Sequence, residues 1–258
     1  MRTKIQKLLK KVQKVLSKAK EVSKRKGVYY VVRTGTKIII TRLINSFRYY
    51  YYKIFKSLIT FTFQGENYRY FYHKYNTTWR NERAVEIPIV WKIMKKYKGR
   101  NILEVGNVLS HYFPVSHDIV DKYEKADGVI NQDVIDFHPS KKYDLIIGIS
   151  TLEHVGWDEN LRDHKILHDP MKILHAIENL KSLLAPKGKM VITLPLGYNP
   201  ELDKLLRNDK IHFTRRFCLK RISEDNKWIE VYWKDAQNAR YNNPFPAANG
   251  LVIGIIEK

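Results

Sequence analysis

Small and acidic residues follow three apolar segments of the chain, at positions where a β-strand would end. Gly106 closes NILEVG, Asp121 follows HDIV, and Asp133 and Val134 close GVINQDV. A glycine there lets the backbone approach a ligand closely, and the amides after it can bind an anionic group. A carboxylate ending the next strand can accept both hydroxyls of a ribose. Asp133 with Val134 suits the amino group and ring edge of an adenine. For each Asp alone, the alternative is a helix cap or a turn.

Acid–base and polar residues follow two further apolar segments. Glu153 and His154 come directly after YDLIIGISTL, and Tyr198 and Asn199 follow KMVITLPLG. His154 can take a proton from a hydroxyl group, and Glu153 can orient it. Trp157, Tyr198 and Asn199 are candidate contacts to an acceptor, since amides and ring faces suit a sugar. The alternatives are that Glu153 caps a turn, that His154 packs against Trp157, and that 198–199 is an ordinary loop.

The elements that position these residues alternate between strands and helices. Apolar runs predict seven strands, at 101–106, 117–123, 128–134, 143–150, 189–197, 227–235 and 250–258. Helical periodicity predicts helices at 84–97, 171–184 and 200–207. This alternation predicts an α/β fold with a doubly wound, mostly parallel, Rossmann-like seven-stranded sheet. Ligands of such sheets bind at the carboxyl ends of the strands, where the residues above lie.

The ordered motifs resemble those of the class I S-adenosylmethionine-dependent methyltransferases. ILEVG resembles the first motif, IVDKYE the acidic second, NQDV the third and YDLIIGISTLEHV the fourth, and LLAPKGKMVITLP is similar to the passage into strand five. The resemblance covers roughly residues 76–258. NTTWRNERAVEIP, EVGNVLSHY and STLEHVGWDE look like bacterial or archaeal members linked to cell-surface glycan synthesis. It implies S-adenosylmethionine as cofactor, contacted by Glu104, Gly106, Asn107, Asp121, Asp133, Val134 and Ser150.

The loop after the first predicted strand departs from the family pattern. Gly106 is followed by Asn-Val-Leu-Ser, and 15 residues separate it from Asp121, where the family commonly needs about 20. The first crossover helix is therefore expected to be one or two turns, near 108–113. The segment 77–86 is a candidate to cover the site, with Arg83 as partner for the carboxylate of the cofactor. The alternative for Arg80 and Arg83 is an ordinary surface helix.

The resemblance implies an enzyme, and its motifs favour oxygen as the methyl acceptor. Ser150-Thr151-Leu152-Glu153 stands where amide-methylating members carry Asn or Asp, Pro-Pro and an aromatic residue. We therefore expect O-methylation of a glycan or another hydroxyl-bearing small molecule. Two alternatives stay open: a catalytically inactive scaffold that binds a partner, and an RNA methyltransferase that uses the basic N-terminus.

Residues 1–60 form a basic arm ahead of the predicted domain at 61–258. They carry 17 Lys or Arg and one acid, Glu21, and so hold +16 of the net charge of +21. Apolar residues at helical spacing from Ile5 to Val22, and again from Ile38 to Leu58, predict an amphipathic helical extension. The arm can bind an anionic membrane surface, a partner protein or a nucleic acid. The apolar stripe favours the first two, because phosphate binding needs the charge and not the stripe.

The cysteine count, the apolar runs and the histidines restrict where the protein can be located and whether it binds a metal. One cysteine, Cys218, excludes an internal disulfide and a Cys-based zinc site. We see no secretory signal and no apolar run near the roughly 20 residues that span a bilayer. We expect a cytoplasmic protein, with peripheral binding at the inner face of the membrane as one role for the arm. Asp163-His164 and His168-Asp169 have the spacing of metal ligands, but the Pro that follows favours a loop and no metal is expected.

Overall fold

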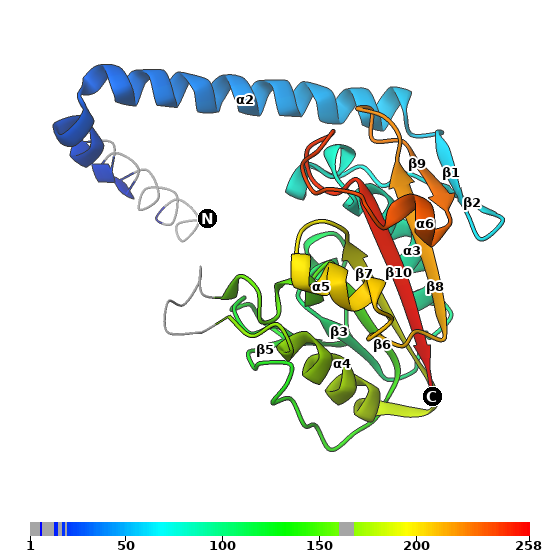
Figure 1. Cartoon of the computed structure of the whole chain (residues 1–258). Helices are drawn as coiled ribbons and strands as arrows, with labels where there is room; N and C mark the ends of the chain where they lie inside the picture. Colours follow the sequence, from blue (N-terminus) through cyan, green and yellow to red (C-terminus); the bar gives the residue numbers. More distant parts are fainter. Residues whose placement is uncertain (1–5, 7–12, 15–16, 19, 160–167) are drawn as a thin grey trace. The chain divides into compact units, whose positions relative to one another are not determined.

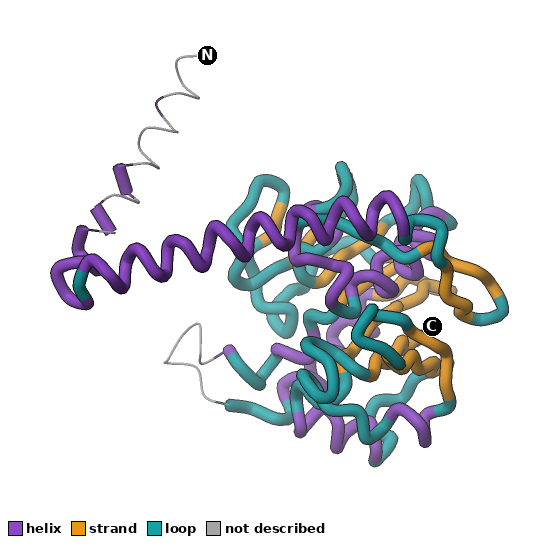
Figure 2. Tube along the Cα trace, turned by 90° about the horizontal axis from the view of Figure 1, so that it is seen from above, coloured by secondary structure: helices purple, strands orange, loops and turns teal. Residues whose placement is uncertain are grey.

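The computed structural model describes residues 6, 13–14, 17–18, 20–159 and 168–258. It divides the chain into two compact units, with the boundary between Tyr51 and Tyr52. Helix α2 (Val28–Phe55) begins after Gly27, whose φ of +84° ends the preceding helical residues 20–26. Figure 2 shows α2 as one continuous helix, which confirms the helical prediction for 38–55. The predicted apolar stripe from Ile5 to Ala19 lies outside the described residues. None of the described helices could span a membrane.

The second unit contains an eight-stranded sheet in the order β5-β4-β3-β6-β7-β10-β8-β9 (Figure 1). The first five strands are parallel, namely β5 (Val129–Ile130), β4 (Asp118–Val120), β3 (Ile102–Val105), β6 (Tyr143–Ile149) and β7 (Leu184–Pro195). The last three pair antiparallel, namely β10 (Gly250–Glu257), β8 (Arg215–Arg221) and β9 (Trp228–Val231). The α/β, mostly parallel architecture is confirmed, and the sheet has one strand more than the seven predicted.

The additional strand is β8, which the sequence pattern did not predict. RRFCLKR contains four basic residues, so it lacks the apolar run that marked the other strands. Cys218 and Leu219 are buried while Arg215 and Lys220 are exposed, because β8 lies between β10 and β9 near the edge of the sheet. The predicted strand at 227–235 is shorter than expected. It ends at Val231, and the short helix α6 (Trp233–Ala236) follows.

Helices cover both faces of the sheet, as a doubly wound fold requires (Figure 1). α4 (Lys172–Leu183) and α5 (Pro200–Arg207) pack on one face, in a core that includes Ile146. α3 (Arg83–Lys95) packs on the other, together with the hairpin β1 (Thr60–Phe63) and β2 (Glu66–Arg69), in a core that includes Leu145 and Ile147. Alternate residues of β6 thus serve opposite cores, which is why the strand is apolar from Leu145 to Ile149.

The crossover from β3 to β4 is short, as expected. It contains only the single 3₁₀ turn η2 (Leu109–His111). Two more 3₁₀ segments border the same edge of the sheet, η1 (Tyr75–Arg80) before α3 and η3 (Leu152–His154) after β6. All three bring polar residues to the carboxyl ends of the parallel strands.

Candidate functional site

A cavity of about 300 Å³ lies at the carboxyl ends of β3, β4, β5 and β6. This volume is at the lower end of the roughly 300–1,000 Å³ typical of small-molecule sites. Seven of the eight residues predicted to contact a cofactor line it, namely Arg83, Gly106, Asn107, Asp121, Asp133, Val134 and Ser150. His154 also lines it. The parallel topology therefore brings together residues that are up to 71 positions apart in the sequence.

Gly106 is required by the packing of the site itself. Its φ is +82°, in the left-handed region, and a Cβ atom there would lie 2.3 Å from the Thr151 Oγ1 atom. Its N–H donates to the carbonyl of Val120 at 2.8 Å, which joins the end of β3 to β4. The glycine thus allows the loops after β3 and β6 to approach each other at the floor of the cavity.

Glu104 does not line the cavity, which corrects its predicted role as a cofactor contact. Its side chain is fully buried. Oε1 accepts hydrogen bonds from the N–H groups of Val108 at 2.9 Å and Leu109 at 2.7 Å, and Oε2 lies 2.7 Å from Nε2 of His117. Glu104 therefore holds the short loop that replaces the usual crossover helix.

Asp121 and Glu124 form the carboxylate side of the cavity. Asp121 Oδ1 accepts from the N–H groups of Tyr123 and Glu124 at 2.8 and 2.7 Å, and Oδ2 accepts from that of Asn107 at 3.2 Å. The Asn107 side chain donates to Glu124 Oε1 at 2.9 Å. Asp121 is thus largely engaged in shaping its loop. Glu124, which was not predicted, lines the cavity as a second carboxylate, and His111 Nε2 lies 3.0 Å from its Oε1. The position of Glu124 in the motif IVDKYE was the available signal.

Asp133 lines the cavity and is held by two lysines, so its predicted role as acceptor for an adenine amino group stays a prediction. Lys122 Nζ and Lys172 Nζ each lie 2.8 Å from Asp133 Oδ2, and both lysines also contact Glu159 at 2.7 Å. Burial alone would raise the pKa of Asp133, but the hydrogen bonds from the lysines lower it. The other oxygen accepts from the N–H of Ile135 at 3.3 Å. The carboxylate is therefore an ionised member of a balanced four-charge network.

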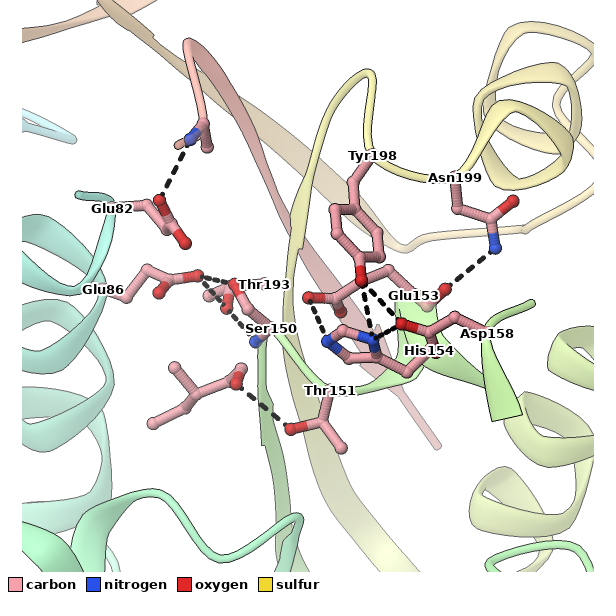
Figure 3. A network of polar contacts seen from close by, with 12 residues as sticks. Glu82, Glu86, Ser150, Thr151, Glu153, His154, Asp158, Thr193, Tyr198 and Asn199 are labelled. Carbon is pink, nitrogen blue, oxygen red and sulfur yellow. Dashed lines mark hydrogen bonds and ion pairs between the residues drawn. The ribbon is translucent and has the colours of Figure 1, made fainter. Parts of the chain in front are cut away.

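Arg83 reaches the cavity from the first turn of α3, paired with a buried carboxylate. Its Nη1 lies 2.5 Å from Glu86 Oε2, and its Nη2 donates to the carbonyl of Ser150 at 3.3 Å. The hydroxyls of Ser150 and Thr193 donate to Glu86 Oε1 (Figure 3). Burial would lower the pKa of the guanidinium, but Glu86 raises it, so Arg83 is charged. The alternative of a surface helix does not apply to Arg83, which is 11% exposed, but does apply to Arg80, which is exposed.

His154 lies between two carboxyl groups, as Figure 3 shows. Its Nδ1 is 2.8 Å from Asp158 Oδ2, and its Nε2 is 3.7 Å from Glu153 Oε1. Tyr198 donates its hydroxyl to the same Asp158 oxygen at 2.6 Å. The Trp157 ring packs edge-on against His168, and Trp157 is not among the residues that line the cavity. Neither the predicted acceptor contact nor its alternative, packing against His154, is therefore observed for Trp157.

Glu153 is buried below the cavity and does not line it. Its side chain is 3% exposed, and Oε2 has no hydrogen-bond partner among the described residues. Burial raises the pKa of Glu153 well above its ordinary value, which favours the protonated form of the carboxyl.

Glu153→Gln is expected to stabilise the protein at neutral pH. Between the ordinary and the raised pKa, the folded state holds a proton that the unfolded state has lost, so stability falls as pH rises through this window. Glutamine removes that dependence. Urea unfolding of the variant and the wild type should give free energies of unfolding that diverge as the pH rises above the ordinary pKa of a glutamate. Parallel curves would contradict a raised pKa for Glu153.

Tyr198 and Asn199, predicted to bind an acceptor, are both engaged within the protein. The Asn199 side chain caps α5, where Oδ1 accepts from the N–H groups of Glu201 at 3.0 Å and Leu202 at 3.1 Å. Its Nδ2 donates to the carbonyl of Glu153 at 2.9 Å, and the residue is 3% exposed. This corrects the acceptor role for Asn199 and supports the loop alternative. Tyr198 does not line the cavity either, since its hydroxyl is directed to Asp158.

The donor set of the cavity fits a ligand that carries a carboxylate, a ribose and an apolar ring. The Arg83 guanidinium offers N–H donors beyond those that Glu86 and Ser150 use, and Glu124 offers acceptor oxygens. Val105, Val120 and Val134 supply the apolar walls. Among the described residues, no three His, Cys, Asp or Glu side chains form a metal site. Asp163 and His164 lie outside the described residues.

Comparison with known proteins yields distant structural similarities only. No family model and no curated protein sequence matches the chain. Among solved structures, a methyltransferase of Archaeoglobus fulgidus described as S-adenosylmethionine-dependent is 16% identical, covering 71% of this chain and 98% of its own, with a TM-score of 0.43. The N-methyltransferase NodS of Bradyrhizobium japonicum WM9, solved with S-adenosylhomocysteine, is 13% identical, covering 61% and 77%, with a TM-score of 0.38. The sugar N-methyltransferase KedS8 of Streptoalloteichus sp. ATCC 53650 is 12% identical, covering 68% and 88%, with a TM-score of 0.35. Values this low do not determine the activity of the chain.

Proposed function

We propose that the chain is an S-adenosylmethionine-dependent methyltransferase whose cofactor binds in the cavity at the carboxyl ends of β3 to β6. The observation that carries this proposal is the convergence of Arg83, Gly106, Asn107, Asp121 and Ser150 on one cavity. These residues were predicted from motifs in separate parts of the sequence. A catalytically inactive scaffold would have no need to keep a guanidinium and two carboxylates directed into the same space.

Residues of opposite charge bind different parts of the cofactor. Arg83 pairs with its carboxylate, and the loop that contains Asn107, Asp121 and Glu124 accepts its ribose hydroxyls. The bound cofactor supplies an electrophilic methyl group on a sulfonium sulfur. The protein then has to orient the acceptor and receive its proton, which His154 does at the edge of the cavity.

Calorimetry with S-adenosylhomocysteine tests this proposal. We expect the full chain to bind it, and Glu124→Ala to weaken binding about 10- to 100-fold, because a charge-assisted hydrogen bond is lost. The matched control is Asp235→Asn, which changes an exposed carboxylate of α6 and should bind like the wild type. No binding at millimolar ligand would contradict the proposal and favour the inactive scaffold.

The acceptor we propose is a hydroxyl group, carried by a glycan or another small molecule. His154 has a nitrogen available as a base, which a hydroxyl needs as it attacks and a neutral amine does not. An RNA acceptor is the alternative, since residues 1–60 are strongly basic. RNA binding by the full chain that falls steeply with salt would favour this alternative, and its absence would favour the small molecule.

We further propose that the first unit binds the surface of an anionic membrane. No acidic residue occurs between Glu21 and Glu66, a stretch that includes all of α2. Ile39, Leu43 and Phe47 of α2 are 59%, 65% and 74% exposed, alongside Arg42 and Arg48. Exposed apolar side chains with interspersed cations suit the boundary between head groups and acyl chains.

Co-sedimentation of the full chain with vesicles tests the membrane proposal. We expect binding to phosphatidylcholine–phosphatidylglycerol vesicles and much weaker binding to phosphatidylcholine alone. Leu43→Asp should reduce binding, whereas Tyr232→Asp, which changes an 80% exposed residue of the second unit, should not. Equal binding to both kinds of vesicle, or none to either, would contradict the proposal. The second outcome would favour a partner protein.

A further inference from the structure

The loop after β6 holds a side-chain arrangement that the sequence analysis did not predict. Asp158 lies four residues after His154, and its Oδ2 atom contacts two polar groups. His154 Nδ1 is 2.8 Å from Oδ2, the Tyr198 hydroxyl donates to Oδ2 at 2.6 Å, and the same hydroxyl lies 3.3 Å from Nδ1 (Figure 3). An ionised carboxylate only accepts hydrogen bonds, so a hydrogen bond to it from Nδ1 requires an N–H there. Tyr198 comes from the loop after β7, so two neighbouring strand ends fix the position of Asp158.

We infer that Asp158 is the positioning residue for His154, holding the proton of the neutral imidazole on Nδ1 and leaving Nε2 as the base that receives the proton of the acceptor. This inference rests on the proposed function. Nδ1 cannot serve as the base while it donates to Asp158. Nε2 is 3.7 Å from Glu153 Oε1, too far for a hydrogen bond, and the His154 side chain is 32% exposed at the edge of the cavity.

The two carboxyl groups beside His154 are in different environments, and this difference selects the tautomer. Glu153 is buried with a raised pKa, and its Oε1 lies 3.7 Å from Nε2, so it makes no hydrogen bond that would hold the imidazole proton on Nε2. Asp158 is stabilised by the Tyr198 hydroxyl, and burial together with Asp158 raises the pKa of Tyr198, which keeps that donor protonated. Further charged and titratable groups lie around these two carboxyl groups: Glu82, Arg83 and Glu86 of α3 and its N-cap near Glu153, and Tyr241 against Tyr198.

Methyl transfer breaks two bonds, forms two bonds and leaves the total charge unchanged. The O–H bond of the acceptor breaks and its proton goes to His154 Nε2, while the oxygen electron pair forms the bond to the methyl carbon. The bond between that carbon and the sulfonium sulfur breaks, and its electron pair stays on sulfur as a neutral thioether. The imidazolium that results is stabilised by the Asp158 carboxylate at Nδ1, and it returns its proton to solvent after the product leaves.

Nitrogen NMR of the histidines in the full-length protein tests the inference without an acceptor. Where the imidazole of His154 is neutral, we expect the wild type to show a protonated Nδ1 and an unprotonated Nε2 for this residue. Asp158→Asn should remove this preference, because the carboxylate that accepts from Nδ1 is lost. Asp158→Glu should restore the preference in part, and Glu153→Gln should leave the tautomer unchanged.

Two results would overturn the inference: a wild-type proton on Nε2, or an Asp158→Asn spectrum that matches the wild type. The wild-type measurement suffices if Asp158→Asn does not fold. Calorimetry with S-adenosylhomocysteine on the same samples separates this inference from the proposed function. Loss of the predicted tautomer with cofactor binding intact would reject the positioning role alone. The predicted tautomer without binding would reject the methyltransferase proposal alone.

Discussion

Arg83→Met is expected to lower the free energy of unfolding by about 3–5 kcal/mol, the cost of leaving a buried charge without its partner. The charge is that of Glu86, which is fully buried and lies 2.5 Å from the guanidinium. The hydroxyls of Ser150 and Thr193 would still donate to it, but neither neutralises it. Urea unfolding followed by circular dichroism measures the change, and S-adenosylhomocysteine binding should be lost in the variant that remains folded.

A second substitution distinguishes charge from packing. In the Arg83→Met background, Glu86→Gln should recover most of the lost stability, because the amide oxygen can still accept from both hydroxyls but carries no charge. It should not recover binding of S-adenosylhomocysteine, since the partner of the ligand carboxylate remains absent. If Arg83→Met lowers the free energy of unfolding by less than about 1 kcal/mol, the Arg83–Glu86 pair is solvated like a surface ion pair, and its description as a buried pair is wrong.

Gly106→Ala is expected to destabilise the protein by about 2–5 kcal/mol and to abolish cofactor binding. Two costs combine at this position. The φ of +82° is unfavourable for any residue with a side chain, and the added Cβ would lie 2.3 Å from Thr151 Oγ1 and 2.6 Å from its Cγ2. The loops after β3 and β6 would have to separate, and both line the cavity. Thermal unfolding and calorimetry measure the two effects.

Gly128→Ala is the matched control for the backbone term. Gly128 has a similar φ of +80°, but no atom lies within 4 Å of the position of a Cβ there. Gly128→Ala should therefore lower the free energy of unfolding only by the roughly 1–2 kcal/mol that the left-handed conformation costs, and it should leave ligand binding intact. Thr151→Ala in the Gly106→Ala background should recover part of the stability, because it removes the two closest atoms. Equal costs for both glycine variants would show that the contact with Thr151 is unimportant.

The fold was predictable where the sequence alone imposes it. A parallel strand buried on both faces is apolar where it is buried, as β6 is from Leu145 to Ile149, and its ends carry turn or ligand residues. That is why the strand ends at Gly106, Asp121 and Asp133 could be located and assigned to one edge of the sheet. The prediction failed at β8, since a strand that exposes part of its surface near the edge of a sheet can carry basic residues and show no apolar run.

The role of each site residue depended on partners that are distant in sequence. Asp133 is occupied because Lys172 of α4 reaches it, and Glu104 because His117 faces it across the short loop. Neither pairing has a sequence signature, because hydrogen bonds and ion pairs act over a few ångströms of space and not along the chain. Asn199 differs, since two of its partners lie only two and three residues away, in the helix that it caps.

The sequence by itself determined the alternation of strands and helices in the parallel part of the sheet, the edge of the sheet where polar residues gather and the concentration of basic charge in residues 1–60. These follow from periodicity and charge, which are local properties of the chain. Only the tertiary structure decided which carboxylates are buried, which are paired and which group faces each nitrogen of His154. These depend on burial and on neighbours such as Asp158 and Tyr198, which the packing of separate strand ends brings within hydrogen-bond distance.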